Sequence, residues 1–152
     1  MLAKVETATV VGLTAVPITV EVDVPGRGLP NLAIVGLPDA TVRESKERLR
    51  SAIRNTQYDW PAGRVTVNLA PADVRKEGSA FDLPIALGIL AASGQLDAAA
   101  FSNVVALGEL ALDGRLRPVP GVLAVALSLK GAGKRLLLPA ANAAEGAWVE
   151  GA

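Results

Sequence analysis

Residues 64–96 most constrain the fold, because they place a strand, a short turn-rich connection and a helix in direct succession. Residues 64–70 alternate polar and apolar side chains, as a half-buried strand does. Residues 83–96 are largely apolar, which is typical of a buried helix. Ser79 lies at the junction between them, a place where nucleophiles and anion sites are often built. The first question that the sequence raises is therefore whether Ser79 is catalytic.

Composition excludes several kinds of chemistry. The 152 residues, 51% of them hydrophobic, fit one domain with a core of its own. Cysteine and histidine are absent, which excludes thiol chemistry, Cys/His zinc sites and His-dependent triads. Any catalytic base would have to be Lys, Asp or Glu. A formal net charge of zero argues against general coating of nucleic acid, although a local basic patch remains compatible with it.

Periodicity and turn signals predict the other elements. Strands over residues 3–11, 18–24 and 32–35 precede an amphipathic helix over 40–55, for which Asp39 is the expected N-cap. Residues 104–110 and 116–119 flank Asp113-Gly114 and predict a hairpin. A helix over 122–130, a strand over 135–138 and a helix capped by Asn142 and running to residue 150 follow. This order, βββαβαββαβα, predicts an α+β fold, an α/β two-layer sandwich with helices mainly on one face.

The helix after Ser79 should face the strand before it. Strand and helix periods direct two apolar sets toward a common core. The helix set is Phe81, Leu83, Ile85, Ala86 and Ile89, and the strand set is Val65, Val67 and Leu69. The N-terminus lacks the apolar stretch of a signal peptide, and the apolar run at 83–93 is too short to span a bilayer. We therefore expect a cytoplasmic protein with no membrane association.

Four motifs give the chain a specific resemblance to a known family. They are Val-Gly-Leu-Pro-Asp at 35–39, Lys-Glu-Gly-Ser-Ala-Phe-Asp-Leu-Pro at 76–84 after Val-Asn-Leu-Ala-Pro-Ala-Asp at 67–73, and Gly-Glu-Leu-Ala-Leu-Asp-Gly at 108–114. Together they resemble the N-terminal domain of the ComM/YifB family of magnesium-chelatase-like AAA+ ATPases. The resemblance implies that residues 1–152 form one Lon-protease-domain-like domain, a ribosomal-protein domain-2-like fold.

The resemblance also implies a larger protein. A further strand and an AAA+ ATPase module would follow, so the chain is expected to be truncated at its C-terminus. ATP and magnesium would belong to that absent module, and no cofactor or metal is expected in this chain. The full-length protein is expected to be a homo-oligomeric ATPase or DNA helicase, with a hexamer as one form, that drives DNA branch migration during recombination or natural transformation. Gly131-Ala132-Gly133-Lys134-Arg135 departs from a phosphate loop and predicts a helix C-cap with a basic turn.

The same resemblance bears on Ser79. Aligning Gly78 with the Lon pattern Lys-Asp-Gly-Pro-Ser-Ala places Ala80 where the nucleophile belongs. The Lon base pattern Pro-Ile-Gly-Gly-Leu-Lys corresponds to residues 118–123, where the lysine has become Leu123. Lys76 is nearer but, as a turn residue, is expected to be solvated and protonated. We expect a non-catalytic domain in which Ser79 caps the helix or bonds backbone. The alternative, a serine-lysine peptidase with Ser79 as nucleophile, requires a lysine amine within hydrogen-bond reach.

Basic residues recur along the helix predicted over 40–55. Lys46, Arg50 and Arg54 follow at intervals of four, with Arg43 one turn earlier, and like charges at this spacing repel. Two interpretations stay open, a solvated face and a surface that contacts DNA phosphates. Sparse aromatic residues argue against base stacking, so backbone contact with duplex or branched DNA is expected. The candidate DNA-binding residues are Arg43, Lys46, Arg50, Arg54, Arg64, Arg75 and Lys76, the last three only if they converge with the helix.

Overall fold

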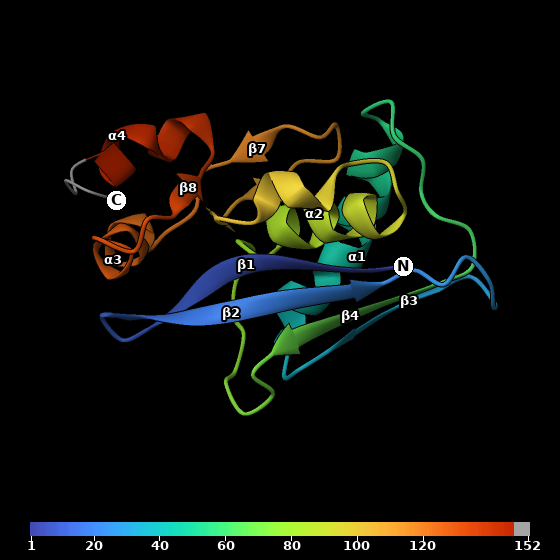
Figure 1. Cartoon of the computed structure of the whole chain (residues 1–152), viewed down its shortest axis with the longest axis horizontal. Helices are drawn as coiled ribbons and strands as arrows, with labels where there is room; N and C mark the ends of the chain where they lie inside the picture. Colours follow the sequence, from blue (N-terminus) through green and yellow to red (C-terminus); the bar gives the residue numbers. More distant parts are fainter. Residues whose placement is uncertain (148–152) are drawn as a thin grey trace.

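The computed structural model describes residues 1–147. Within them, six strands form one mixed sheet in the order β3-β4-β2-β1-β5-β8 (Figure 1). The strands are β1 (Leu2–Val11), β2 (Thr14–Asp23), β3 (Asn31–Val35), β4 (Arg64–Ala70), β5 (Val104–Ala106) and β8 (Arg135–Leu137). A two-stranded hairpin, β6 (Glu109–Leu110) and β7 (Leu116–Arg117), lies apart from this sheet.

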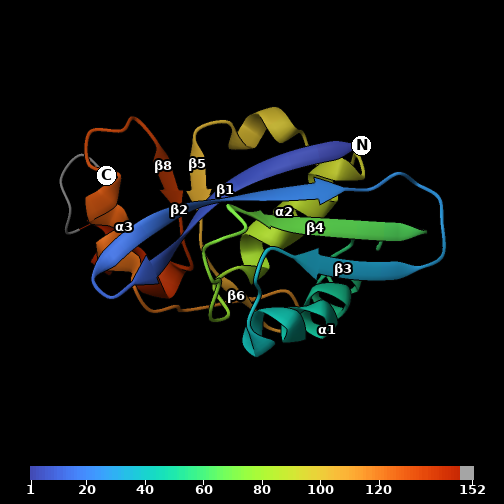
Figure 2. The same ribbon diagram turned by 90° about the horizontal axis from the view of Figure 1, so that it is seen from below.

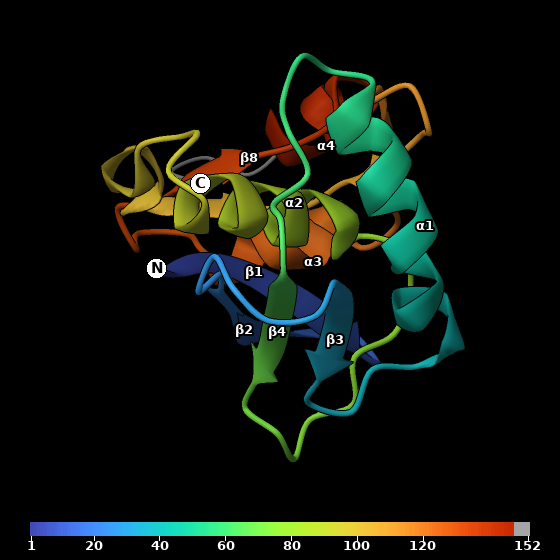
Figure 3. The same cartoon turned by 90° about the vertical axis from the view of Figure 1, so that its right-hand side faces the viewer.

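The helices cover one face of the long strands. They are α1 (Ala40–Arg54), α2 (Asp82–Ala92), α3 (Val122–Ser128) and α4 (Ala143–Ala147), with 3-10 turns at Ala98–Phe101 and Ala140–Asn142. Figure 3 shows α1, α2 and α3 on the same side of β1, β2, β3 and β4. The predicted α+β fold with two layers is thus confirmed.

Alternation along the strands explains the two layers. Val20 and Val22 of β2 and Val67 of β4 are fully buried under the helices, whereas their neighbours Glu21 and Asn68 are partly exposed. Each strand therefore offers one apolar face to the core and one polar face to water. The predicted helix and strand sets all belong to one apolar core and are at most 8% exposed, so this prediction is confirmed.

The predicted hairpin over 104–110 and 116–119 is partly wrong. Val104–Ala106 instead enters the main sheet, parallel to β8 and touching β1, while only Glu109–Leu110 pairs with Leu116–Arg117. The three residues of β5 are all buried, and the Thr7 hydroxyl donates to the Ala106 carbonyl at 2.6 Å. The turn at Asp113-Gly114 therefore closes a hairpin shorter than predicted, because long-range pairing draws residues 104–106 into the main sheet.

Asn142 directly precedes α4, where it was predicted to cap a helix, but its side chain bonds Val119 instead. It ends a 3-10 turn, and its side chain accepts from the Val119 N–H at 2.9 Å and donates to the Val119 carbonyl at 3.0 Å. The amide thus ties the last turn to the segment before α3. The remainder of the predicted last helix, up to residue 150, lies outside the described residues. In the part of the chain that the structure describes, no helix is both long and apolar enough to cross a bilayer.

A polar cleft beside the α1 and α2 N-termini

Two loops are joined side by side at the ends of β3 and β4. The Lys76 N–H donates to the Leu37 carbonyl at 3.0 Å, and the Asp39 N–H donates to the Lys76 carbonyl at 2.9 Å. Gly36 permits the close approach, since its φ is +102° and a Cβ there would lie 2.1 Å from the Leu69 oxygen. The motif at 35–39 is therefore fixed against the segment that leads to Ser79.

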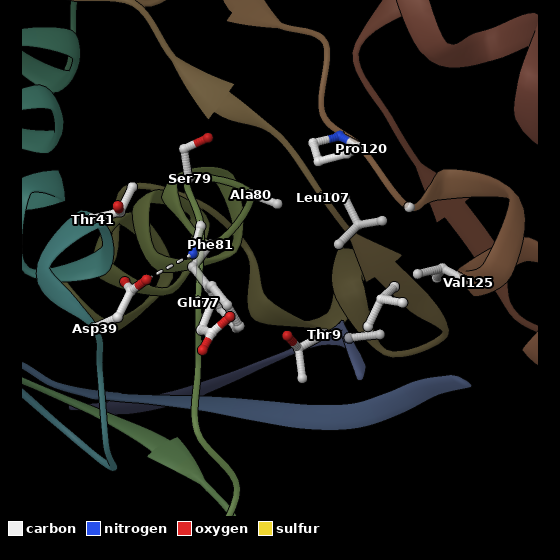
Figure 4. Close-up of a pocket in the computed structure, with 14 residues that line it drawn as sticks. Thr9, Asp39, Thr41, Glu77, Ser79, Ala80, Phe81, Leu107, Pro120 and Val125 are labelled. Carbon is white, nitrogen blue, oxygen red and sulfur yellow. Dashed lines mark hydrogen bonds between the residues drawn. The ribbon is translucent and has the colours of Figure 1, made fainter. Parts of the chain in front are cut away.

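Asp39 caps α1 as predicted and also holds the second loop. One carboxylate oxygen accepts from the Val42 N–H at 2.8 Å. The other accepts from the Gly78 N–H at 3.3 Å, as the dashed line in Figure 4 shows. One side chain thus satisfies a helix N-terminus and orders the turn before Ser79.

Lys76 is not the solvated residue that was expected. Its side chain is fully buried, and its amine donates to the Pro71 carbonyl within the same loop. Burial lowers the pKa of the Lys76 amine from 10.5, and the nearby Asp73 carboxylate opposes this shift. Lys76 therefore fastens the loop from inside and is withdrawn from the surface on which a DNA-contacting residue must lie.

Ser79 lines a cleft of about 490 Å³ between the start of α1 and the start of α3. Its side chain points away from that of Glu77 in Figure 4. No side-chain bond caps α2, whose N-cap is Phe81, and Ser79 contributes only its carbonyl, which accepts from the Asp82 N–H at 3.2 Å. Within residues 1–147, the Ser79 hydroxyl neither caps the helix nor bonds backbone, so this expectation is wrong. None of the Ser79, Thr9 and Thr41 hydroxyls bonds the other lining residues (Figure 4).

Lys76 and Lys134 have partners other than Ser79. Lys76 donates to Pro71, and Lys134 forms an ion pair with Glu6. Leu123, which the resemblance aligns with the Lon base, lies on α3 with its side chain partly exposed. Within residues 1–147, no lysine amine forms a hydrogen bond with the Ser79 hydroxyl.

A buried ion pair behind the cleft was missed by the sequence reasoning. Arg48 of α1 donates to both oxygens of Asp82 on α2, at 2.7 and 3.1 Å, and the Leu110 N–H donates to the same carboxylate at 3.0 Å. Burial raises the pKa of the Asp82 carboxyl, while these hydrogen bonds oppose the rise. An acidic residue within the apolar run 81–86 was the available signal, since a buried carboxylate needs a partner.

The basic candidates do not form one cluster. Arg43 donates to the Pro38 carbonyl at 2.9 Å, and Arg75 pairs with Glu77 at 3.1 Å. Arg64 begins β4, whereas Arg75 follows the other end of the strand, and the six steps from Arg64 to Ala70 alone span about 20 Å. Arg64 and Arg75 therefore do not converge.

The α1 residues do share one side of the helix. Arg50 lies over the Trp60 ring at 5.7 Å and 3.9 Å from Glu47. Lys46 and Arg54 form no ion pair within residues 1–147. We call Arg43, Lys46, Arg50 and Arg54 the basic flank of α1. No group of three or more carboxylates in the described part of the chain is placed to hold a metal ion.

Comparison with known proteins places this architecture in a family. Residues 20–142 match the family model for subunit ChlI of Mg-chelatase. The chain is 49% identical to YifB of Salmonella typhimurium over 144 residues, which are 95% of this chain and 28% of that protein. It is 47% identical to the competence protein ComM of Haemophilus influenzae over 148 residues, 97% of this chain and 29% of ComM.

The chain therefore belongs to the magnesium-chelatase-like AAA+ family that includes YifB and ComM. It spans less than a third of the length of these relatives. A protein of Mycobacterium tuberculosis is more distant, at 39% identity over 151 residues.

Proposed function

We propose that this chain is a non-catalytic, Lon-like N-terminal domain of a ComM-type ATPase, which contacts DNA and supports assembly of the ATPase. The Ser79 region supports the absence of peptidase chemistry. A serine nucleophile requires a base within hydrogen-bond reach. The Lys76 amine is buried against Pro71, and Leu123 replaces the expected base.

The proposed DNA contact is made by the basic flank of α1. Lys46 and Arg54 have no carboxylate partner among residues 1–147, and the Glu47 partner of Arg50 is 83% exposed. Exposed ion pairs of this kind are worth little, so they leave the positive field of the flank largely intact. Phosphates would relieve the mutual repulsion of these cations and release counterions.

The experiment replaces Lys46, Arg50 and Arg54 by Ala in the full-length protein and measures binding to duplex and forked DNA over a range of salt. Each phosphate contact removed should reduce the salt slope by about 0.9. Basal ATP hydrolysis should stay unchanged. The matched control replaces Arg115, Arg117 and Lys130, three exposed cations on other elements. Equal affinity and equal salt slope in both triple variants would contradict the proposal.

For the whole protein, we propose ATP-driven DNA branch migration during recombination or natural transformation. The supporting observation is the 47% identity to a protein named for competence. The domain would hold the ATPase modules in register within an oligomer. The exposed loops at 26–31 and the partly buried Trp60-Pro61 are the proposed contacts between copies. Disrupting them should lower the oligomer mass measured by sedimentation without unfolding the domain.

A further inference from the structure

One edge of β1 is open along the cleft. β1 pairs with β2 along its whole length, from Leu2 to Val11. On its other edge it pairs with β5 only at Glu6, opposite Val105. In Figure 2, β5 lies beside β1 over only a short part of the longer strand. Past that point no strand within residues 1–147 pairs with this edge of residues 8–11, although Ala8 and Thr9 are only 9% and 7% exposed, and Ala8 packs with Val122 and Val125 of α3.

This open edge forms one wall of the cleft. Ala8, Thr9 and Val10 line the cavity of about 490 Å³. A second hollow of about 470 Å³ shares Thr9, Val10 and Glu77 with the first and is also lined by Val16 of β2 and by Arg75. At about 3.3 Å per residue, four edge residues offer some 13 Å, the span of about four residues of an extended chain. The space beside the edge therefore fits a strand.

The side chains that line the larger cavity indicate which class of ligand it can bind. Its lining contains the Asp39 and Glu77 carboxylates and the hydroxyls of Thr9, Thr41 and Ser79, but no lysine or arginine. Such a lining repels phosphate and attracts a cation. Glu77 is paired with Arg75, but both side chains are largely exposed, so a ligand can exchange for Arg75 at small cost. The cleft is therefore unsuited to DNA.

We propose that the cleft binds an extended peptide segment of a partner protein, which adds as a strand to the edge of β1 at residues 8–11. Backbone hydrogen bonds to an unpaired edge supply affinity in this mode, and side-chain contacts supply specificity. A lysine or arginine of the peptide would point toward Asp39 and Glu77. This binding is separate from the proposed DNA contact, which uses the basic flank of α1.

The test titrates the 152-residue chain with a peptide mixture and follows backbone amide shifts and hydrogen exchange. The peptides have about eight residues, with lysine fixed at the centre and Val, Ile, Leu or Thr around it, enough to cover the edge. We expect saturation at about 10 µM to 1 mM, with exchange slowed at residues 8–11. Peptides N-methylated at every residue should not bind, since no amide remains to donate to the ladder whichever side of the peptide faces β1.

Reversing the charge of a residue that lines the cleft tests whether the peptide binds there. Glu77→Lys should weaken binding about five- to tenfold, through the loss of an attractive charge and the gain of a repulsive one. The matched control is Asp113→Lys, because Asp113 is also an exposed carboxylate paired with an exposed arginine, Arg115, at 3.4 Å. The control should bind as the unaltered chain does.

Three outcomes would overturn the proposal. The first is no shift at residues 8–11 at about 5 mM peptide, several times the upper end of the expected range. The second is binding that N-methylation or Glu77→Lys leaves unchanged. The third is self-association without peptide that Glu77→Lys abolishes, which would assign the edge to a second copy of this chain.

Discussion

Polar groups at the contact between α1 and α2 are paired, whereas hydroxyls in the cleft at the N-termini of the same helices are not paired with one another. At the contact, Asp82 is 1% exposed, and its carboxylate oxygens accept three hydrogen bonds, from Arg48 and Leu110. In the cleft, the Ser79 and Thr9 hydroxyls form no bond with the other lining residues (Figure 4). Buried polar groups must be paired to be tolerated, whereas groups that face a cleft can be held for a ligand. The ion pair is therefore structural, whereas the hydroxyls in the cleft are available to a ligand.

The largest effect is expected from Arg48→Met. It removes both bonds from Arg48 and leaves the Asp82 carboxylate buried without a cationic partner, which should lower the free energy of unfolding by about 3–5 kcal/mol. The double variant Arg48→Met/Asp82→Leu should recover most of this loss, because no buried charge remains. Urea denaturation measures both. A loss below about 1 kcal/mol for the single variant would place Asp82 in contact with water.

Gly36→Ala tests whether the wall of the cleft is rigid. The new Cβ would lie 2.1 Å from the Leu69 oxygen, whereas at Gly12, which also has positive φ, nothing lies within 4 Å. Gly12→Ala should cost about 1 kcal/mol for its conformation alone, and Gly36→Ala roughly 2 kcal/mol more because backbone must shift. Equal melting temperatures for the two variants would mean that the loop at 35–39 yields easily.

Lys76→Met tests whether burial of the Lys76 amine makes the stability of the domain depend on pH. Burial lowers the Lys76 pKa in the folded chain, while the unfolded chain regains 10.5. Between these two values the unfolded state binds more protons, so stability relative to Lys76→Met should rise as pH increases toward 10.5 and stay constant below the folded pKa. Unfolding free energies measured from neutral pH upward give the difference. Lys130→Met, at an exposed lysine, should show no such slope, and a flat curve for Lys76→Met as well would contradict burial.

The smallest effect is expected from Ser79→Ala. A hydroxyl that no neighbour bonds can be removed at a cost within about 0.5 kcal/mol. ATP hydrolysis and DNA binding of the full-length protein should also stay unchanged. Calorimetry and a DNA-binding assay measure these quantities. Loss of a peptidase activity on this substitution would instead identify Ser79 as a nucleophile.

Local sequence patterns were sufficient to predict those features that depend on the residues of a single helix or strand. The alternation at 64–70 and the apolar run after Ser79 predicted both sides of the core. The Asp39 cap was predictable because it depends only on the three residues that follow it. The motifs at 35–39, 76–84 and 108–114 were sufficient to indicate the family, which the comparisons show.

Tertiary contacts decided the rest, because they join residues far apart in sequence. β5 was predicted in a hairpin but lies in the main sheet, because there it pairs with β1 and β8 in a buried position. Lys76 looks like any turn lysine in sequence, and only the packing of loops 35–39 and 71–80 buries it. The Arg48–Asp82 pair spans 34 residues, which no local period reveals. The sequence thus determined the family, the two layers and the core, while the fold decided which charges are buried, which hydroxyls face the cleft and which strand edge stays open.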